Sequence, residues 1–129
     1  MGAAGTDDDI LEPGEKLLWE RPANMAWRRG AISGHLLLTE RRVVFEPHRV
    51  EVLKGLSRWS APLGRIAAVG TQPRSYNPFT GSLRPRLRLA MEDGSVEIFL
   101  VNDLASAIGD VTRAVERKRA GSDRDQPTG

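Results

Sequence analysis

The chain has 129 residues, of which 19 are Lys or Arg and 17 are Asp or Glu, so its net charge is +2, and it contains no Cys. This length favours a single domain, and the lack of Cys excludes disulfide bonds, thiolate zinc sites and cysteine nucleophiles. The near-neutral total conceals −5 on residues 1–20, +10 on residues 21–88 and −3 on residues 89–129, an asymmetry that bears on partners rather than on the fold.

The two ends of the chain are small, polar and rich in Gly and Asp. Residues 1–11 lack the basic and apolar regions of a secretory signal, and no apolar run approaches the roughly 18 residues that span a membrane. We therefore expect a soluble, cytoplasmic protein, with peripheral attachment to the inner membrane face as a further option. We expect disordered tails at residues 1–11, which are acidic, and 119–129, on either side of one domain at residues 12–118.

Between these tails, short apolar runs broken by Gly and Pro predict β-strands. A turn is expected at residues 39–41, between the third and fourth strands. The predicted strands are Lys16–Glu20, Met25–Arg28, Ala31–Thr39, Arg42–Glu46, Arg58–Ala61, Ile66–Thr71, Arg86–Glu92 and Ser95–Val101.

The last two strands have the best-defined pairing. Asp93-Gly94 predicts a two-residue hairpin turn of the type with positive φ at both positions. Closing this turn pairs Leu89 with Ile98 and gathers the aliphatic side chains on the core face. Phe99 then falls on the outer face, beside the arginines of the preceding strand.

After the strands, the periodicity changes to that of one amphipathic helix. Leu104, Ile108, Val111 and Val115 form one helical stripe. We expect a helix from about Asp103 to Arg119 that packs this stripe on the sheet. The elements together predict a mainly β fold, a barrel of about seven antiparallel strands capped by a C-terminal helix.

Several segments carry a resemblance to a known family. They resemble, in order and spacing, the GRAM domains and bacterial PH-like domains, and the likeness spans roughly residues 12–118. It implies the PH superfold, in which two nearly orthogonal antiparallel sheets are closed at one end by a C-terminal helix. The segments are Pro13–Lys16, Gly34–Phe45, Trp59–Val69, Glu92–Ser95 and Val101–Asp103.

The resemblance also implies a class of function. Members of this superfamily are usually non-enzymatic modules that bind phosphoinositides, other anionic lipids, peptides or proteins. The residues themselves favour no catalysis, because His35 and His48 have no second ligand at a metal-like spacing and no phosphate-binding Gly loop or nucleophile elbow is present. We expect no catalytic residue, no metal site and no cofactor.

Basic residues in or beside the loops between the early strands are the main candidate ligand site. Arg suits phosphate because its planar side chain donates two parallel hydrogen bonds. The alternative is a solvated surface in a chain that generally prefers Arg. The candidate ligand-binding residues are Arg28, Arg29, Arg41, Arg42, Arg49, Lys54 and Arg58.

A second candidate loop combines aromatic and basic residues. Its aromatic side chains would enter a membrane interface, grip a peptide, or simply pin the loop to its own sheet. The residues of this loop are Arg74, Tyr76, Phe79 and Arg84. The three Trp residues, Trp19, Trp27 and Trp59, are expected in the core or at its edge.

Arg74, followed after nine residues by the alternating Arg84, Arg86 and Arg88, matches the basic spacing of headgroup-binding PH domains, but in a different segment. The first hairpin lacks that signature, which argues against specific phosphoinositide recognition. We interpret the three arginines as the outward face of the last hairpin.

The leading functional prediction is a PH/GRAM-like binding module that meets anionic lipid headgroups or a protein partner through the basic loops of the early strands. An alternative is a regulatory adaptor that binds a peptide at a sheet edge and has no lipid role. A weaker alternative is a small nucleic-acid-binding barrel, which needs a basic groove with exposed aromatic side chains.

Overall fold

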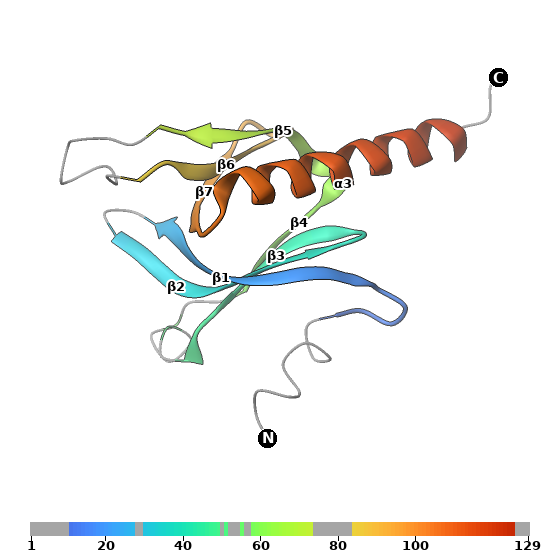
Figure 1. Ribbon diagram of the computed structural model, residues 1–129. Coiled ribbons are helices and arrows are strands. Elements are labelled where there is room, and N and C mark those ends of the chain that lie inside the picture. Colours follow the sequence, from blue (N-terminus) through green and yellow to red (C-terminus); the bar gives the residue numbers. More distant parts are fainter. Residues whose placement is uncertain are drawn as a thin grey trace.

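A computed structural model describes residues 11–27, 30–49, 51, 55, 58–73 and 84–125. Its main elements are an antiparallel sheet of seven strands and a long helix after them (Figure 1). The elements are β1 (Leu17–Trp27), β2 (Gly30–Thr39), β3 (Arg42–Pro47), β4 (Trp59–Pro62), the short 3₁₀ turn η2 (Leu63–Arg65), β5 (Ile66–Gln72), β6 (Arg86–Met91), β7 (Val96–Val101) and α3 (Leu104–Asp125).

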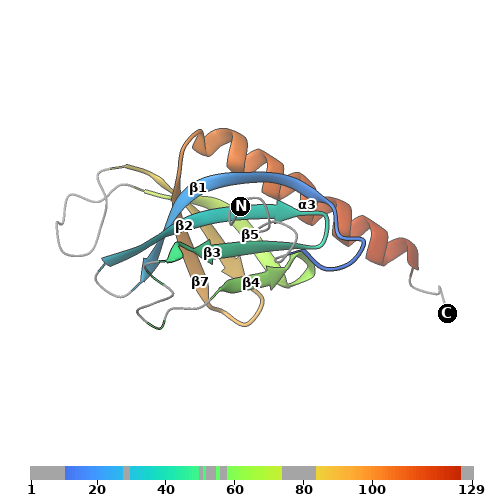
Figure 2. The same cartoon turned by 90° about the horizontal axis from the view of Figure 1, so that it is seen from below.

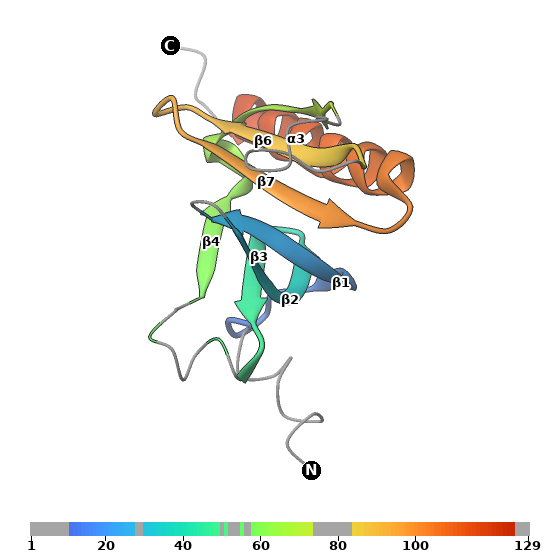
Figure 3. The same cartoon turned by 90° about the vertical axis from the view of Figure 1, so that its left-hand side faces the viewer.

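The strands follow the order β4-β3-β2-β1-β7-β6-β5, so β4 and β5 are edges and the sheet does not close into a barrel. The sheet bends so that β1–β4 and β5–β7 form two facing layers (Figure 3). Helix α3 packs against β5, β6 and η2. The predicted fold class, mainly β with seven antiparallel strands and a C-terminal helix, is confirmed, whereas the predicted barrel is an open, bent sheet because β4 and β5 are not paired with each other.

The hydrophobic core lies between the two layers and the helix. Phe45 of β3 and Phe99 of β7 are fully buried, with their ring centroids 5.9 Å apart. The predicted helical stripe packs into this core and is joined by Ala107 and Ala114. Trp19 and Trp59 pack against the margin of the core as expected, whereas the side chain of Trp27 lies outside the described residues.

β1 is one continuous strand of 11 residues, where the sequence predicted two strands separated near Pro22. Pro22 is paired with His35 of β2, and the pairing of β1 with β7 begins one residue later, at Ala23. A proline lacks the amide hydrogen that a central strand uses, and a strand tolerates it where one side is unpaired. Pro22 therefore fits at the point where β1 still has an open side.

The hairpin between β6 and β7 has a register one residue away from the predicted one. Leu89 pairs with Glu97, and Leu87 pairs with Phe99, so Phe99 faces the core. The amide of Met91 donates to the carbonyl of Ser95 at 2.8 Å, which encloses a three-residue loop. Of the loop residues, only Gly94 has a positive φ, as in a turn followed by a bulge. The predicted two-residue turn was wrong.

α3 extends through Asp125, whereas the sequence predicted an end near Arg119. The Nη2 group of Arg119 donates to the carbonyls of Ile66 and Ala67 on β5 at 2.9 and 3.0 Å. These bonds hold the second half of the helix to the sheet. The weak helix formers after Arg119 suggested a tail, but the anchored helix continues through them.

Arg21 of β1 joins the first layer to the start of α3. Its guanidinium donates to the carbonyls of Asn102 and Asp103 at 3.3 Å and to the hydroxyl of Ser106 at 3.0 Å. It also forms an ion pair with Asp110 at 3.5 Å. This arginine therefore serves the fold rather than a ligand.

Candidate functional site

The connections between the first four strands lie at two ends of their layer, because antiparallel neighbours reverse direction. The β1–β2 and β3–β4 connections leave at one end and the β2–β3 turn lies at the other (Figure 2). Arg49 and Arg58 belong to the first end, and Arg41 and Arg42 belong to the second. The basic residues predicted as one site therefore divide between two ends. Arg28, Arg29 and Lys54 lie outside the described residues.

Arg42 is engaged by a buried carboxylate. Its Nε and Nη2 atoms each donate to the carboxylate of Glu15 at 2.9 Å. The hydroxyl of Thr39 donates to the same carboxylate at 2.7 Å, and the amide of Glu12 donates at 2.9 Å. The Glu15 side chain has no exposed surface. We therefore do not retain Arg42 in the proposed ligand site.

The electrostatics of this cluster follow from its hydrogen bonds. The Arg42 guanidinium, with smaller contributions from the Glu12 amide and the Thr39 hydroxyl, lowers the pKa of Glu15 from 4.5 to about 2, although burial opposes this. The carboxylate in turn raises the pKa of Arg42. Both groups are charged at neutral pH, and together they hold the segment before β1 against the β2–β3 turn.

The other described basic candidates are more exposed. Arg41 lies beside Glu12, with Nη1 3.9 Å from the carboxylate oxygen. Arg58 pairs with Glu46 of β3 through Nε, and Arg49 is exposed. These side chains are accessible to an anionic partner, and for Arg58 such a partner would compete with Glu46.

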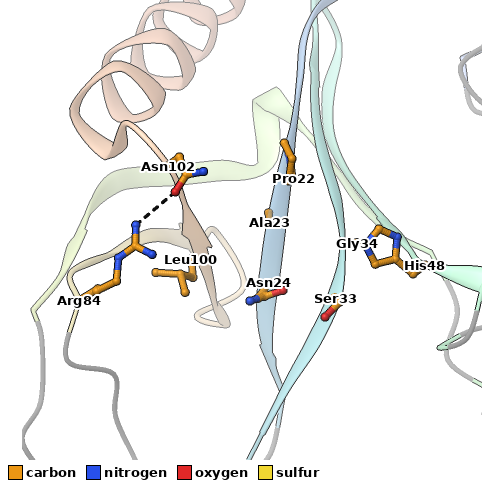
Figure 4. Close-up of a pocket in the computed structure, with 9 residues that line it drawn as sticks. All are labelled: Pro22, Ala23, Asn24, Ser33, Gly34, His48, Arg84, Leu100 and Asn102. Atoms are coloured by element: carbon orange, nitrogen blue, oxygen red, sulfur yellow. Dashed lines mark hydrogen bonds between the residues drawn. The ribbon is translucent and has the colours of Figure 1, made fainter.

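A groove of about 270 Å³ opens on the outer side of the sheet where β1 meets β7 (Figure 4). Arg84 reaches across its rim and donates from Nη2 to the side-chain oxygen of Asn102 at 3.3 Å. Arg84 is the one residue of the second candidate loop that lies within the described part of the chain; Arg74, Tyr76 and Phe79 do not. The lining residues are Pro22, Ala23, Asn24, Ser33, Gly34, His48, Arg84, Leu100 and Asn102.

Sequence reasoning missed this groove because its lining comes from several elements that are far apart in the chain. Asn24, Ser33 and Asn102 are neutral polar residues with no spacing signal. The only sequence signal near the groove was the alternation of arginines that begins at Arg84.

Comparison with known proteins identifies the architecture. No family model and no curated protein matches the chain. Among solved structures, the Vps36 N-terminal PH domain is similar with a TM-score of 0.65 and 18% identity, over 86% of each chain. The chain has a PH-like fold. Two further structures are similar at the level of the fold.

One is the C-terminal domain of an unknown protein from Leishmania infantum, with a TM-score of 0.66 and 13% identity over 88% of this chain and 95% of that one. The other is the linker-DH/PH structure of p115-RhoGEF, with a TM-score of 0.56 and 10% identity over 88% of this chain and 32% of that one. The prediction of a PH-like fold is confirmed, and membership of the GRAM family stays a prediction.

The titratable groups of the PH-like domain outside the Glu15 cluster are structural in character. Burial, with a smaller effect of the nearby Asp93 charge, raises the pKa of Glu97. Hydrogen bonds from the Ser95 hydroxyl and amide lower the pKa of Asp93, which stabilises the β6–β7 turn. Asp93 lines a second hollow of about 190 Å³ together with Ser60 and Ser95, and its carboxylate there accepts hydrogen bonds from the amide and hydroxyl of Ser95.

His35 and His48 lie together on the outside of the PH-like domain, with ring centroids 5.1 Å apart in an edge-to-face contact. Over the described ranges, no three His, Asp or Glu side chains come together as a metal site would require. The same part of the chain holds no helix with the length and apolarity needed to cross a bilayer.

Proposed function

We propose that the chain is a non-enzymatic PH-like binding module that meets anionic lipid headgroups through the end of the sheet where the β1–β2 and β3–β4 connections leave. One observation carries the proposal. The strand ends that flank the two connections, Trp27 and Gly30 on one side and Pro47 and Trp59 on the other, lie at that end. In the sequence, residues 28–29 and 48–58 contain five Lys or Arg residues against one Glu. Of these, Arg49 and Arg58 have exposed side chains.

The expected affinity is modest and depends on salt. Each basic residue near an anionic leaflet contributes about 1 kcal/mol, and this attraction decays over a Debye length of about 10 Å at 0.1 M salt. Five such residues therefore support reversible association rather than permanent attachment. A site of this kind senses the charge density of the membrane more than the identity of one headgroup.

Vesicle sedimentation tests the proposal. We expect the protein to sediment with phosphatidylcholine vesicles that contain about 30% phosphatidylserine at about 0.1 M salt, to be released at about 0.5 M salt, and not to bind pure phosphatidylcholine. The variant R49Q/R58Q should bind several-fold more weakly. The control R117Q/K118Q removes the same charge from exposed positions of α3 and should bind as the wild type does.

Equal sedimentation with neutral and anionic vesicles would remove the lipid proposal. Equal weakening by the control variant would show a general effect of net charge rather than a site.

An adaptor that binds a peptide at a sheet edge is the second candidate. The observation that favours it is that β4 and β5 are edge strands, and edge strands offer backbone groups to an added strand. On β5, the Arg119 side chain already binds the carbonyls of Ile66 and Ala67, so an added strand would pair with the later residues. Partner binding that persists at about 0.3–0.5 M salt, where charge attraction is screened, would favour this candidate over the lipid module.

A further inference from the structure

Two arginines of β6 face away from the core. Leu87 and Leu89 are fully buried, and because successive strand residues point to opposite faces, Arg86 and Arg88 lie on the outer face. Both side chains are half-buried by their neighbours. Arg84, which precedes the strand, continues the alternation at the rim of the groove described above.

The strands on either side extend this surface. Gln72 of β5 pairs with Arg86, and Ile98 of β7 pairs with Arg88. Leu100 of β7 pairs with Asn24 of β1. We name this surface the arginine face and define it as the outward residues Gln72, Arg86, Arg88, Ile98, Leu100, Asn24, Ala26 and Ser33.

The two arginines of this face have no carboxylate partner. The residues of the face include no Asp or Glu, and Glu97 pairs with the buried Leu89 and so lies on the inner face. At the β2 margin of the face, the Glu51 carboxylate accepts a hydrogen bond from the Ser33 amide at 3.0 Å. Within the described residues, neither Arg86 nor Arg88 forms an ion pair. Arg42, Arg58 and Arg113, by contrast, each have a carboxylate partner. Arg86 and Arg88 are therefore the arginines of the described strands that have no carboxylate partner.

Arg86 also carries an unsatisfied donor. Its Nε atom is buried and has no hydrogen-bond partner among the described residues. The great majority of buried donors in proteins are hydrogen-bonded, and within the described residues the Trp19 indole N–H is a second exception. A carboxylate or phosphate oxygen is the strongest acceptor for a guanidinium N–H.

The adjoining groove supplies neutral hydrogen-bonding groups beside this charge. Asn24, Ser33 and Asn102 line it together with the apolar side chain of Leu100 (Figure 4). Amide and hydroxyl side chains both donate and accept hydrogen bonds, as the backbone of an extended peptide requires. The surface thus offers an arginine pair for acidic side chains and a polar groove for a main chain.

We propose that the arginine face and its groove bind an extended acidic peptide segment of a protein partner. Alternate residues of β6 are about 6.6–6.8 Å apart, the same repeat as alternate side chains of an extended peptide, so carboxylates two residues apart on the ligand match Arg86 and Arg88. Nucleic acid is disfavoured because the face holds no Phe, Tyr or Trp for base stacking. A bilayer is disfavoured because these arginines are half-buried on a sheet rather than raised on loops.

The test uses the full chain and a labelled peptide of about twelve residues that alternates Glu and Thr, with fluorescence anisotropy at about 0.1 M salt. The comparison peptide has the same composition with all Glu residues in one block. We expect the alternating peptide to bind at least about fivefold more tightly than the block peptide. R86Q/R88Q should weaken it about tenfold, as expected for losing charge-assisted hydrogen bonds, and R117Q/K118Q should leave it unchanged.

A second variant guards against a folding defect in the first. Q72E places a carboxylate beside Arg86 with little change of shape and should compete with the peptide, so we expect a loss of at least about fivefold with an unchanged melting temperature. Several results would overturn the proposal: no peptide binding, equal binding of the two peptides, or equal loss in the control variant. Tighter binding of oligo-dT than of the peptide would also overturn it. So would tighter binding of anionic vesicles, if that binding were lost in R86Q/R88Q.

Discussion

Glu15 is a buried carboxylate whose charge is sustained by side chains from another part of the chain. Arg42 and Thr39 both contact it, and its side chain is fully buried. A buried charge is tolerated only when it is paired and hydrogen-bonded, and removal of one partner is costly. This cluster thus helps to attach the segment before β1 to the β2–β3 turn, together with the bond from the Glu40 amide to the Lys16 carbonyl at 3.0 Å.

The pKa of Glu15 makes stability depend on pH. Because the folded value is about 2 and the ordinary value is 4.5, the ionised group contributes roughly 3 kcal/mol above pH ~4.5. This contribution is lost as the pH falls from ~4.5 to ~2. We expect E15Q to reduce the free energy of unfolding at pH 7 by about 2–3 kcal/mol, and the gap to the wild type to close near pH 2, as measured by urea denaturation.

The exposed acid Glu40 supplies the control. E40Q should follow the pH profile of the wild type. A gap between E15Q and the wild type that stayed constant from pH 7 to pH 2 would contradict the role of the Glu15 charge.

The sequence alone does not show whether a single arginine is exposed or is bound to a buried carboxylate. Arg41 and Arg42 are adjacent and were predicted together as ligand residues, yet Arg42 is bound to a buried carboxylate and Arg41 lies exposed beside Glu12. The difference depends on which side chain turns towards Glu15, 27 residues earlier in the chain. No local pattern contains that information. The alternation of Arg86 and Arg88 was readable because strand periodicity alone decides their face.

At the scale of elements, the β6–β7 hairpin tests the observed register. Phe99 is fully buried beside Phe45 and Trp59, whereas Ile98 lies on the outer face. We expect F99A to cost about 3–5 kcal/mol of unfolding free energy, as for a buried aromatic side chain. I98A should cost about 1 kcal/mol or less. Thermal and urea unfolding of both variants would measure these costs. A larger loss of unfolding free energy in I98A than in F99A would support the register predicted from the sequence instead.

The hairpin was misread because both faces of β7 are apolar. Ile98 and Leu100 alternate with Phe99 and Val101, so either register places aliphatic or aromatic side chains on the core face. Register is specified strongly only where one face is clearly polar. Asp93-Gly94 suits a two-residue turn, but Gly94 also suits the bulge position of a three-residue loop. The helix stripe was predicted correctly because its polar face is distinct.

At the scale of the whole molecule, the fold was predictable because most strand pairs are neighbours in sequence. The antiparallel pairs β1–β2, β2–β3, β3–β4, β5–β6 and β6–β7 all join consecutive strands. The β1–β7 pair is the exception, and its three residue pairs bring distant segments together. That contact creates the outer groove, so the groove depends on tertiary structure that no local pattern encodes.

The same sheet separates the two proposed surfaces. β3 and β6 are four strand spacings apart in the sheet order and lie in different layers of the bent sheet (Figure 3). Substitutions at independent positions without shared partners add in free energy within about 0.5 kcal/mol. We therefore expect the lipid surface at the loop end and the arginine face to act independently.

A four-variant comparison tests this independence. R49Q/R58Q should lose vesicle binding and keep peptide affinity, R86Q/R88Q should do the reverse, and the combined variant should show the sum of the two losses in each assay. Peptide affinity should also be similar for free and vesicle-bound protein, because Arg86 and Arg88 belong to β6 and not to the connections of the lipid end. His48, which lines the groove and begins the β3–β4 connection, is the point where the two sites adjoin. If either double variant lost both activities, the arginines would act as one diffuse positive field. The +10 segment as a whole, rather than two separate surfaces, would then attract the partner.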